Sequence, residues 1–341
     1  MYPLDQGKWG PTVRIGHLRD ELGELAELDV LHGYRGARRR ALGRYAFSGR
    51  LRRLDGIYVE SSSFLPAEAD LAFLGLARAL GVPVLTYVRD AYQLFPDEYA
   101  LGSWRARAAA TAFRPMVRGL DAVSTRLAFP TRGLAEAVLG SRADQAVLLP
   151  PGAPAPVDVP RAATADRLLF VGDARLLAQG GSRLVAAVER ARQDGVEVEL
   201  TVVSRPGQEP APPHPDWLRV ERAEGEAIHA LLPGIIGTVI PRPLGEYNHL
   251  ALPVKLFDYL SYGRPLLVTD CLEQARVVRE ADAGIVVGDT VDALAAGVAM
   301  LARAPSDALD RWSANAVAGA EASSWRDRAR SIVALLAAGR G

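Results

Sequence analysis

The chain has 341 residues, 49% of them hydrophobic and 23% charged, and its formal net charge at pH 7 is zero. This length exceeds one typical core and predicts two domains, while the balanced charge argues against a nucleic-acid-binding protein held by bulk electrostatics. Because it has one cysteine (Cys271), no apolar signal sequence and no apolar run of ~18 residues that could span a membrane, we expect a cytoplasmic protein.

In the first half, short runs rich in Val, Ile and Leu alternate with helical patterns such as residues 66–80, which is typical of parallel βαβ units. A glycine turn, residues 7–10 (GKWG), opens a helix with Pro11 in its first turn. A buried strand should precede such a turn, yet only MYPLDQ is available, so the first strand is missing or degenerate, and we favour a missing strand. The other strands are expected over residues 28–33, 56–61, 82–88, 121–125 and 145–149.

Residues 150–165 are dense in proline and alanine and form the best linker in the chain. After it the alternation restarts, with a helix near residues 180–194 and then a helical tail that is broken at Pro305 and ends in an amphipathic helix over residues 325–339. The sequence therefore predicts an α/β fold of two doubly wound parallel-sheet domains. Strands of the second half are expected over residues 167–172, 196–204, 235–241 and 284–288.

Several common chemistries lack their motifs. The chain has no G-x-G-x-x-G turn after a strand, no phosphate-binding P-loop, no G-x-S-x-G elbow and no Asp-x-Asp pair. The five histidines have no metal-like spacing. We therefore expect no metal and no cofactor, and a ligand that lies between the two domains.

Residues 253–268 (PVKLFDYLSYGRPLLV) predict a helix, a glycine that ends it and a buried strand. The helix N-terminus and the amides of the preceding loop are suited to a diphosphate. Lys255, one of only two lysines, lies in the first turn and needs an anionic partner, and Asp258 lies one turn further on the same side. Its carboxylate can accept hydrogen bonds from two hydroxyls of a sugar, so the pattern favours a nucleotide sugar; the alternative is an exposed ion pair worth ~0.3–0.5 kcal/mol.

This motif resembles the donor site of GT-B-fold glycosyltransferases, especially the mostly retaining "family four" group of bacterial enzymes. There the helix carries a Glu that binds the donor ribose five residues before a glycine, and Asp258 has that place relative to Gly263. Residues 85–96 (LTYVRDAYQLFP), 148–153 (LLPPGA) and 168–172 (LLFVG) are similar to three further motifs of the family, in the same order along the chain.

The resemblance implies two Rossmann-like domains facing each other across a cleft. Residues 1–152 would bind the acceptor, residues 153–322 the nucleotide sugar, and the helix over residues 323–341 would cross back to the first domain. It implies metal-independent transfer of a sugar from a nucleoside diphosphate to a hydroxyl of a glycan, lipid-linked glycan or small molecule, as in polysaccharide biosynthesis. The alternatives are a non-catalytic nucleotide-sugar or glycan-binding partner subunit and a GT-B-fold sugar epimerase.

The donor side departs from the family pattern in two places. Relatives carry a second Glu where this chain has Leu250, so Glu246 or Asn248 would have to substitute for it. They also carry an Arg and a Lys after the opening strand, where this chain has Asp173 and Gln179. Arg175 could supply that charge from a shifted place, and Gly172 would let a phosphate approach the strand end.

On the acceptor side the resemblance points to Asp90 as base or orienter, with Arg89 beside it; the alternatives are a cap of the following helix and a local Arg89–Asp90 pair. Lys8 and Gly10 would face the cleft or form a plain turn. Residues 35–53 hold eight arginines with apolar residues between them. They form either a solvated face or a basic amphipathic helix that rests on anionic lipid at the inner face of the plasma membrane.

Overall fold

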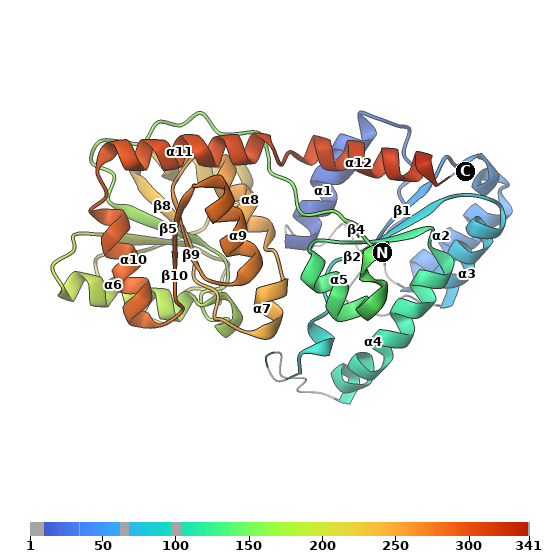
Figure 1. The fold of residues 1–341 in the computed structure, drawn as a ribbon, viewed down its shortest axis with the longest axis horizontal. Helices are drawn as coiled ribbons and strands as arrows, with labels where there is room; N and C mark the ends of the chain where they lie inside the picture. The colour runs from blue at the N-terminus through green and yellow to red at the C-terminus, as the bar shows by residue number, and fades with distance from the viewer. Residues whose placement is uncertain (1–9, 34, 62–67, 97, 99–103, 340–341) are drawn as a thin grey trace. The chain divides into compact units, whose positions relative to one another are not determined.

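The computed structural model describes residues 10–33, 35–61, 68–96, 98 and 104–339. They divide into two compact units, each built on its own parallel sheet (Figure 1). The first unit contains the described residues up to Gly152 together with the stretch that starts at Trp325, and the second runs from Ala153 to Ser324. The expected pair of parallel-sheet α/β domains is confirmed.

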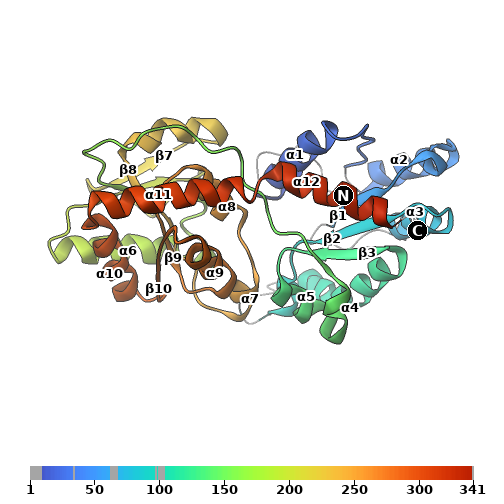
Figure 2. The ribbon, with the colours of Figure 1, turned by 45° about the horizontal axis from the view of Figure 1, so that its top comes forward.

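In the first unit every described strand pairing is parallel, in the order β1-β2-β3-β4. Helices α1 and α12 pack against each other, and α3 packs against α2 and α4 (Figures 1 and 2). The strands are β1 (Ile57–Ser61), β2 (Val84–Val88), β3 (Arg126–Phe129) and β4 (Val147–Leu148). The helices are α1 (Gly10–Gly23), α2 (Arg35–Phe47), η1 (Arg50–Arg53), α3 (Glu68–Ala79), η2 (Tyr92–Leu94), α4 (Trp104–Val123), α5 (Arg132–Leu139), η3 (Gly140–Gln145) and α12 (Trp325–Ala338).

Two expected strands of this unit are wrong. Residues 28–33 form no strand, because no described strand lies beside them to pair with. Residues 121–125 mostly continue α4, whose last turns bury Val117 and Leu120, and the strand begins only at Arg126. A short apolar run cannot be assigned to helix or strand by periodicity alone.

The second unit has a sheet of order β10-β9-β8-β5-β6-β7, again parallel throughout. The strands are β5 (Arg167–Val171), β6 (Glu199–Val203), β7 (Leu218–Glu221), β8 (Ile235–Ile240), β9 (Leu266–Thr269) and β10 (Gly284–Val287). The helices are η4 (Leu177–Gln179), α6 (Gly181–Gln193), η5 (Gly225–Gly234), α7 (Glu246–Leu250), α8 (Val254–Ser261), α9 (Leu272–Ala281), α10 (Val291–Ala302) and α11 (Ser306–Glu321).

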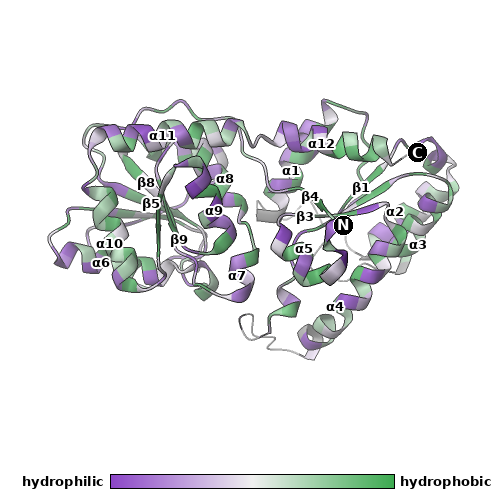
Figure 3. Cartoon of the chain, in the orientation of Figure 1, coloured by the Kyte–Doolittle hydropathy of each residue, from purple (hydrophilic) through white to green (hydrophobic). Residues whose placement is uncertain are grey.

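Two apolar cores cover the faces of this sheet. Helices α6 and α10 bury their apolar sides in one core, while α8 and α11 contribute to the other. Strands β5, β8 and β9 consist mainly of hydrophobic residues, as buried parallel strands do (Figure 3). From β5 the chain adds β6 and β7 on one side and β8 to β10 on the other, so the strand order reverses between β5 and β8. Open α/β sheets bind ligands at the carboxyl ends of the strands at such a point.

No helix in the described part of the chain combines the length and the apolar character that a membrane crossing needs.

Candidate anion-binding site

Two loops meet at the carboxyl ends of β5 and β8. The first leaves β5 at Gly172 and returns to α6 through Gly180, and the second begins at Pro241. A methyl group on Gly180 would lie 1.8 Å from the carbonyl oxygen of Pro241, so the loops can pack this closely only with glycine there. The strand-order reversal therefore places these two loops in direct contact.

Lys255 reaches this meeting point from the first turn of α8. Its Nζ donates hydrogen bonds to the Val171 carbonyl oxygen at 3.3 Å and to Gln179 Oε1 at 3.1 Å, and it lies 4.8 Å from the centre of the Phe170 ring. Burial, together with the nearby positive charge of Arg242, lowers the pKa of Lys255 to about 7. No described carboxylate forms a salt bridge with Lys255, so it is a desolvated cation without a counter-charge.

Arg242, which the sequence analysis did not single out, supplies a second cation. Its side chain is buried and contacts Asn248 Oδ1, and its Nη1 donates to the Ala251 carbonyl oxygen at 3.1 Å. Thr269 Oγ1 donates to the Arg242 carbonyl oxygen at 2.6 Å and so holds the backbone of this loop. The two acceptors of the Arg242 guanidinium, Asn248 Oδ1 and the Ala251 carbonyl oxygen, are both neutral. The available sequence signal was a charged residue two positions after a buried strand.

The N-terminus of α8 adds partial positive charge beside the two cations. Pro253 occupies the N-cap position and provides no side-chain cap. The first-turn N–H groups of a helix have no intrahelical partner and carry the positive end of the helix dipole. Tyr259 fixes α8 against β5, because its hydroxyl accepts a 2.7 Å hydrogen bond from the Val171 N–H. We call Lys255, Arg242 and these first-turn amides the cationic cluster.

Asp258 lies one turn beyond Lys255 and is partly buried. Burial raises the pKa of its carboxyl group to about 7. Among the described residues no donor bonds its carboxylate, and it forms no ion pair with Lys255. The structure therefore does not contain the exposed i,i+3 ion pair that the sequence left as an alternative. A desolvated acid without a partner is typical of a group that awaits a ligand.

The remaining donor-side residues surround the cluster in different ways. Gly172 follows β5 directly, next to Lys255 and Gln179. Arg175 is exposed, and its Nε donates to the Glu209 carbonyl oxygen at 2.8 Å. Asn248 is buried against Arg242, and its Nδ2 donates to the Pro243 carbonyl oxygen at 2.9 Å. Glu246 lies exposed in the first turn of α7 and has no described hydrogen-bond partner.

Replacing Gly172 by Ala should damage this site directly. Its φ is +148°, and an added methyl would lie 2.2 Å from Gln179 Oε1 and 3.2 Å from Lys255 Nζ. We expect G172A to lower the free energy of unfolding by roughly 1–3 kcal/mol because both the backbone and the Lys255–Gln179 pair must shift. Urea denaturation measures this. Gly207→Ala is the matched control: it also has positive φ but no atom within 4 Å of the added methyl. Equal losses in both variants would show that backbone strain, and not crowding at the cluster, sets the effect.

The acceptor-side residues lie in the first unit. Asp90 follows β2 and pairs with Arg89 at 2.6 Å, as one sequence alternative proposed. The short η2 and not a long helix follows them, and its N-cap is Ala91. Gly10 begins α1, and Lys8 lies outside the described residues.

A second buried group, missed by the sequence analysis, lies at the carboxyl end of β1. Arg14 Nε donates to Glu60 Oε1 at 3.0 Å, and the Tyr58 hydroxyl donates to the same oxygen at 2.6 Å. The Arg14 guanidinium also stacks on Tyr87, 3.8 Å from the ring centre. In the described residues no group of three or more His, Cys, Asp or Glu side chains is arranged to hold a metal ion.

The comparisons with known proteins concern the fold. No family model and no curated protein sequence matches the chain. Solved structures do match it. A glycosyltransferase from Rickettsia africae ESF-5 superposes with a TM-score of 0.62 at 11% identity, covering 94% of this chain and 87% of that one. The chain has the GT-B fold.

Two further similar structures are UDP-forming trehalose-phosphate synthases. That of Burkholderia xenovorans, in complex with glucose-6-phosphate, has a TM-score of 0.60 at 12% identity and covers 94% of this chain and 80% of that one. That of Burkholderia multivorans has a TM-score of 0.58 at 12% identity, covering 96% and 78%. At 11–12% identity these superpositions show a shared fold and nothing about activity.

Proposed function

We propose that this chain is a glycosyltransferase that moves a sugar from a nucleoside diphosphate to a hydroxyl acceptor, in the manner of the "family four" group. The observation that carries the proposal is the cationic cluster at the strand-order reversal. Two desolvated cations and a helix N-terminus without a described counter-charge form a site for a polyanion. The GT-B fold of the similar glycosyltransferases supports the same assignment.

The residue roles are part of the proposal, and the position of each group supports them. Lys255, Arg242 and the first-turn amides of α8 bind the diphosphate, and Asp258 accepts hydrogen bonds from the ribose hydroxyls. Asn248 orients Arg242 through their contact. Gly172 leaves room for the phosphates at the end of β5. Glu246 and Arg175 stay candidates for the donor because both side chains are exposed near these loops.

In the proposed reaction the bond between the sugar C1 and the diphosphate oxygen breaks, and a bond from C1 to the acceptor oxygen forms. The leaving diphosphate gains negative charge, which the cationic cluster stabilises without a metal. Asp90, assisted by Arg89, takes the proton of the acceptor hydroxyl or orients it. For Lys8 and Gly10 the acceptor role rests on the sequence resemblance alone; the acceptor itself is a glycan, a lipid-linked glycan or a small molecule.

A thermal-shift screen of nucleoside diphosphate sugars tests the donor proposal. A ligand at a hundred times its dissociation constant should add ~2.7 kcal/mol to the free energy of unfolding. Release of free nucleoside diphosphate on addition of acceptor then tests turnover, and unchanged rates in EDTA test its independence of metal. If no nucleotide sugar or nucleoside diphosphate stabilises the protein, the proposal is wrong.

A non-catalytic nucleotide-sugar-binding subunit is the second candidate. The loop after β5 favours it, because relatives carry an Arg and a Lys there that neutralise the diphosphate. In this chain Gln179 contacts Lys255 instead, and Arg175 donates to a backbone carbonyl oxygen. Tight binding of the diphosphate without turnover of any donor would support it. A sugar epimerase, the third candidate, would convert the donor without any acceptor.

We also propose a peripheral contact with anionic membrane through residues 35–53. Of the arginines there, Arg38 is buried against Asp70 and Arg50 binds Asp29, so neither is available. The rest of the described surface of this segment keeps a basic character, and Phe47 at the end of α2 is 94% exposed. The exposed arginines without a described partner are Arg39, Arg40, Arg44, Arg52 and Arg53.

Vesicle sedimentation measures this contact. Each arginine near an anionic surface is worth about 1 kcal/mol, so reversing the charge of Arg39, Arg40 and Arg44 together should reduce binding to phosphatidylserine-containing vesicles at least roughly tenfold. Charge reversal of Arg303, Arg311 and Arg326 is the control for net charge. Two results would contradict the proposal: equal binding of the two triple variants to anionic vesicles, or equal binding of the native chain to neutral and anionic vesicles.

A further inference from the structure

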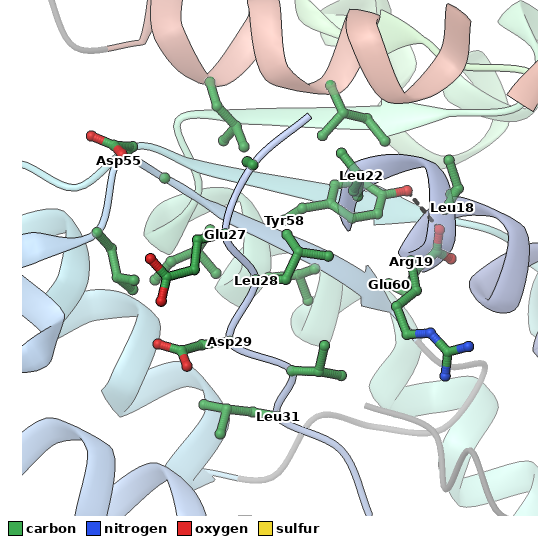
Figure 4. A pocket seen from close by; sticks show the side chains of 18 of the residues that line it. Leu18, Arg19, Leu22, Glu27, Leu28, Asp29, Leu31, Asp55, Tyr58 and Glu60 are labelled. Carbon is green, nitrogen blue, oxygen red and sulfur yellow. Dashed lines mark hydrogen bonds between the residues drawn. The ribbon is translucent and has the colours of Figure 1, made fainter. Parts of the chain in front are cut away.

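A partly open cavity of about 910 Å³ lies in the first unit, beside the edge of β1 that faces away from β2 (Figure 4). β1 forms one wall, and residues 25–32 form another. Two packed helix pairs, α1 with α12 and α2 with α3, supply the remaining lining. In Figure 4, Leu18 and Leu22 of α1, Tyr58 of β1 and Leu28 surround this space. The surroundings are those of a position inside a sheet, with helices as the outer layers.

The backbone of β1 has hydrogen-bonding groups directed toward this cavity. The Ile57 N–H donates to the Pro83 carbonyl oxygen at 2.9 Å, which directs Ile57, Val59 and Ser61 toward β2. Because successive residues of a strand alternate in direction, the N–H and C=O groups of Tyr58 and Glu60 point to the opposite edge. No described strand pairs with that edge, although Val59 and Glu60 are buried. Unpaired backbone groups at a buried edge are unfavourable.

Residues 28–32 lie on the other side of the cavity, and there too no described strand pairs with the backbone. Their sequence, LDVLH, has the pattern of a strand, yet they pair with no described strand. Leu25, Leu28 and Val30 line the cavity and are 36%, 38% and 47% exposed. An apolar strand in the cavity would cover these side chains and would lie next to both backbones.

The size of the cavity fits one strand. A strand rises ~3.3 Å per residue, occupies ~4.8 Å of sheet width and lies between layers ~10 Å apart, so it needs roughly 160 Å³ per residue. A volume of about 910 Å³ therefore holds five to six residues. β1, the strand beside it, has 5 residues.

We propose that this cavity receives an apolar, parallel β-strand of the same polypeptide that precedes the residues MYPLDQ. α1 begins near the carboxyl end of β1, where Arg14 bonds Glu60, so a strand parallel to β1 would end where the chain enters α1. The strand, α1 and residues 28–32 then form one βαβ unit. MYPLDQ does not have the composition of a central strand, because Pro3 has no N–H to donate and Asp5 is charged.

An engineered extension tests the proposal. Six apolar β-branched residues placed ahead of Met1 should raise the melting temperature by about 5 °C or more, because the cavity is filled. Hydrogen exchange of the Tyr58 and Glu60 amides should slow on the order of 100-fold, while that of Val59, directed toward β2, changes little. The control extension has the same length and carries proline at alternate positions. Unchanged exchange of both amides in the apolar extension would overturn the proposal.

Two further measurements keep the proposal testable if the extended chain aggregates. The intact mass of the protein isolated from its native source should exceed the 36.5 kDa of this sequence; a native mass of 36.5 kDa would overturn the proposal. The apolar segment added as a separate peptide should protect Tyr58 and Glu60 far less than the fused one. Equal protection would assign the cavity to a partner chain and would also overturn it.

Discussion

Replacing Asp258 by Asn should make the free protein more stable above pH 7 and remove its response to the donor. Burial raises the pKa of the Asp258 carboxyl group to about 7 from a model-peptide value of 3.8. The folded protein therefore holds a proton that the unfolded chain has lost between these values. Stability attributable to this group is full below pH ~4 and is lost as the pH rises through ~7.

Above pH 7 the native carboxylate is charged, desolvated and without a described partner. One pKa unit corresponds to ~1.4 kcal/mol, so we expect D258N to add roughly 2–4 kcal/mol to the free energy of unfolding at pH 8. The gain should shrink toward zero below pH ~4, because there the carboxyl group of Asp258 is protonated in both the folded and the unfolded native chain. Differential scanning calorimetry across this pH range measures it.

The same variant should lose the donor-induced thermal shift, because an amide is a weaker acceptor for the ribose hydroxyls and does not take part in a charge-assisted hydrogen bond. Asp292→Asn is the matched control: Asp292 is exposed in the first turn of α10, and its replacement should change stability by less than ~0.5 kcal/mol at every pH. If D258N is no more stable than the native chain at pH 8, the carboxylate has a partner in solution and the ribose role loses its basis.

Replacing Lys255 by Met should weaken diphosphate binding on the order of 100-fold at pH 6.5, where the ammonium is charged. Two unit charges ~4 Å apart attract by ~4 kcal/mol at an effective dielectric constant of 20. Isothermal titration with a nucleoside diphosphate measures the loss. A bound anion raises the pKa of Lys255 above its free value of about 7, so the native protein should take up a proton on binding near pH 8. Buffers of different ionisation enthalpy detect that proton.

The stability of this variant should have the opposite pH signature to that of D258N. The pKa of Lys255 falls from a model-peptide value of 10.5 to about 7, so the cost of its buried charge is full below pH ~7 and disappears as the pH rises to ~10.5. K255M should therefore gain stability relative to the native chain mainly at acidic pH. The gain is reduced because the Val171 carbonyl and Gln179 lose a donor.

Arg205→Met is the control for this second prediction. Arg205 follows β6 in the same unit and pairs with Glu224 at the surface, so its loss should leave diphosphate binding unchanged within ~twofold. Equal weakening by R205M and K255M would mean that general charge, not the cationic cluster, attracts the anion. A pH-independent affinity of the native chain between pH 6.5 and 8.5 would contradict the assigned titration of Lys255.

The sequence predicted the second unit more accurately than the first. The strands beginning near residues 167, 196, 235 and 284 are present, because buried parallel strands are continuous apolar runs bounded by turn residues. β7 was missed: its sequence, LRVE, alternates and has too few apolar residues to stand out. The strand expected at residues 28–33 has the right pattern, but within the described part of the chain no strand lies beside it to pair with. Strand formation needs a partner as well as a propensity.

For the candidate site, the sequence by itself determined the segment that carries the lysine and the aspartate. Pro253, Lys255, Asp258 and Gly263 define a helix tip, a cation, an acid and a stop within eleven residues, and this local order depends only on short-range geometry. The parallel α/β class followed in the same way from the alternation of apolar runs and helical patterns.

Only the tertiary structure decided which residues surround Lys255. Strand order brings the loops after β5 and β8 together and places Arg242, far from Gly172 in sequence, in the same cluster. It also decided that Lys255 and Asp258 are desolvated and not paired with each other, and that one edge of β1 lies beside a cavity and pairs with no described strand. Burial and strand adjacency are set by contacts between distant segments, and no local pattern encodes them.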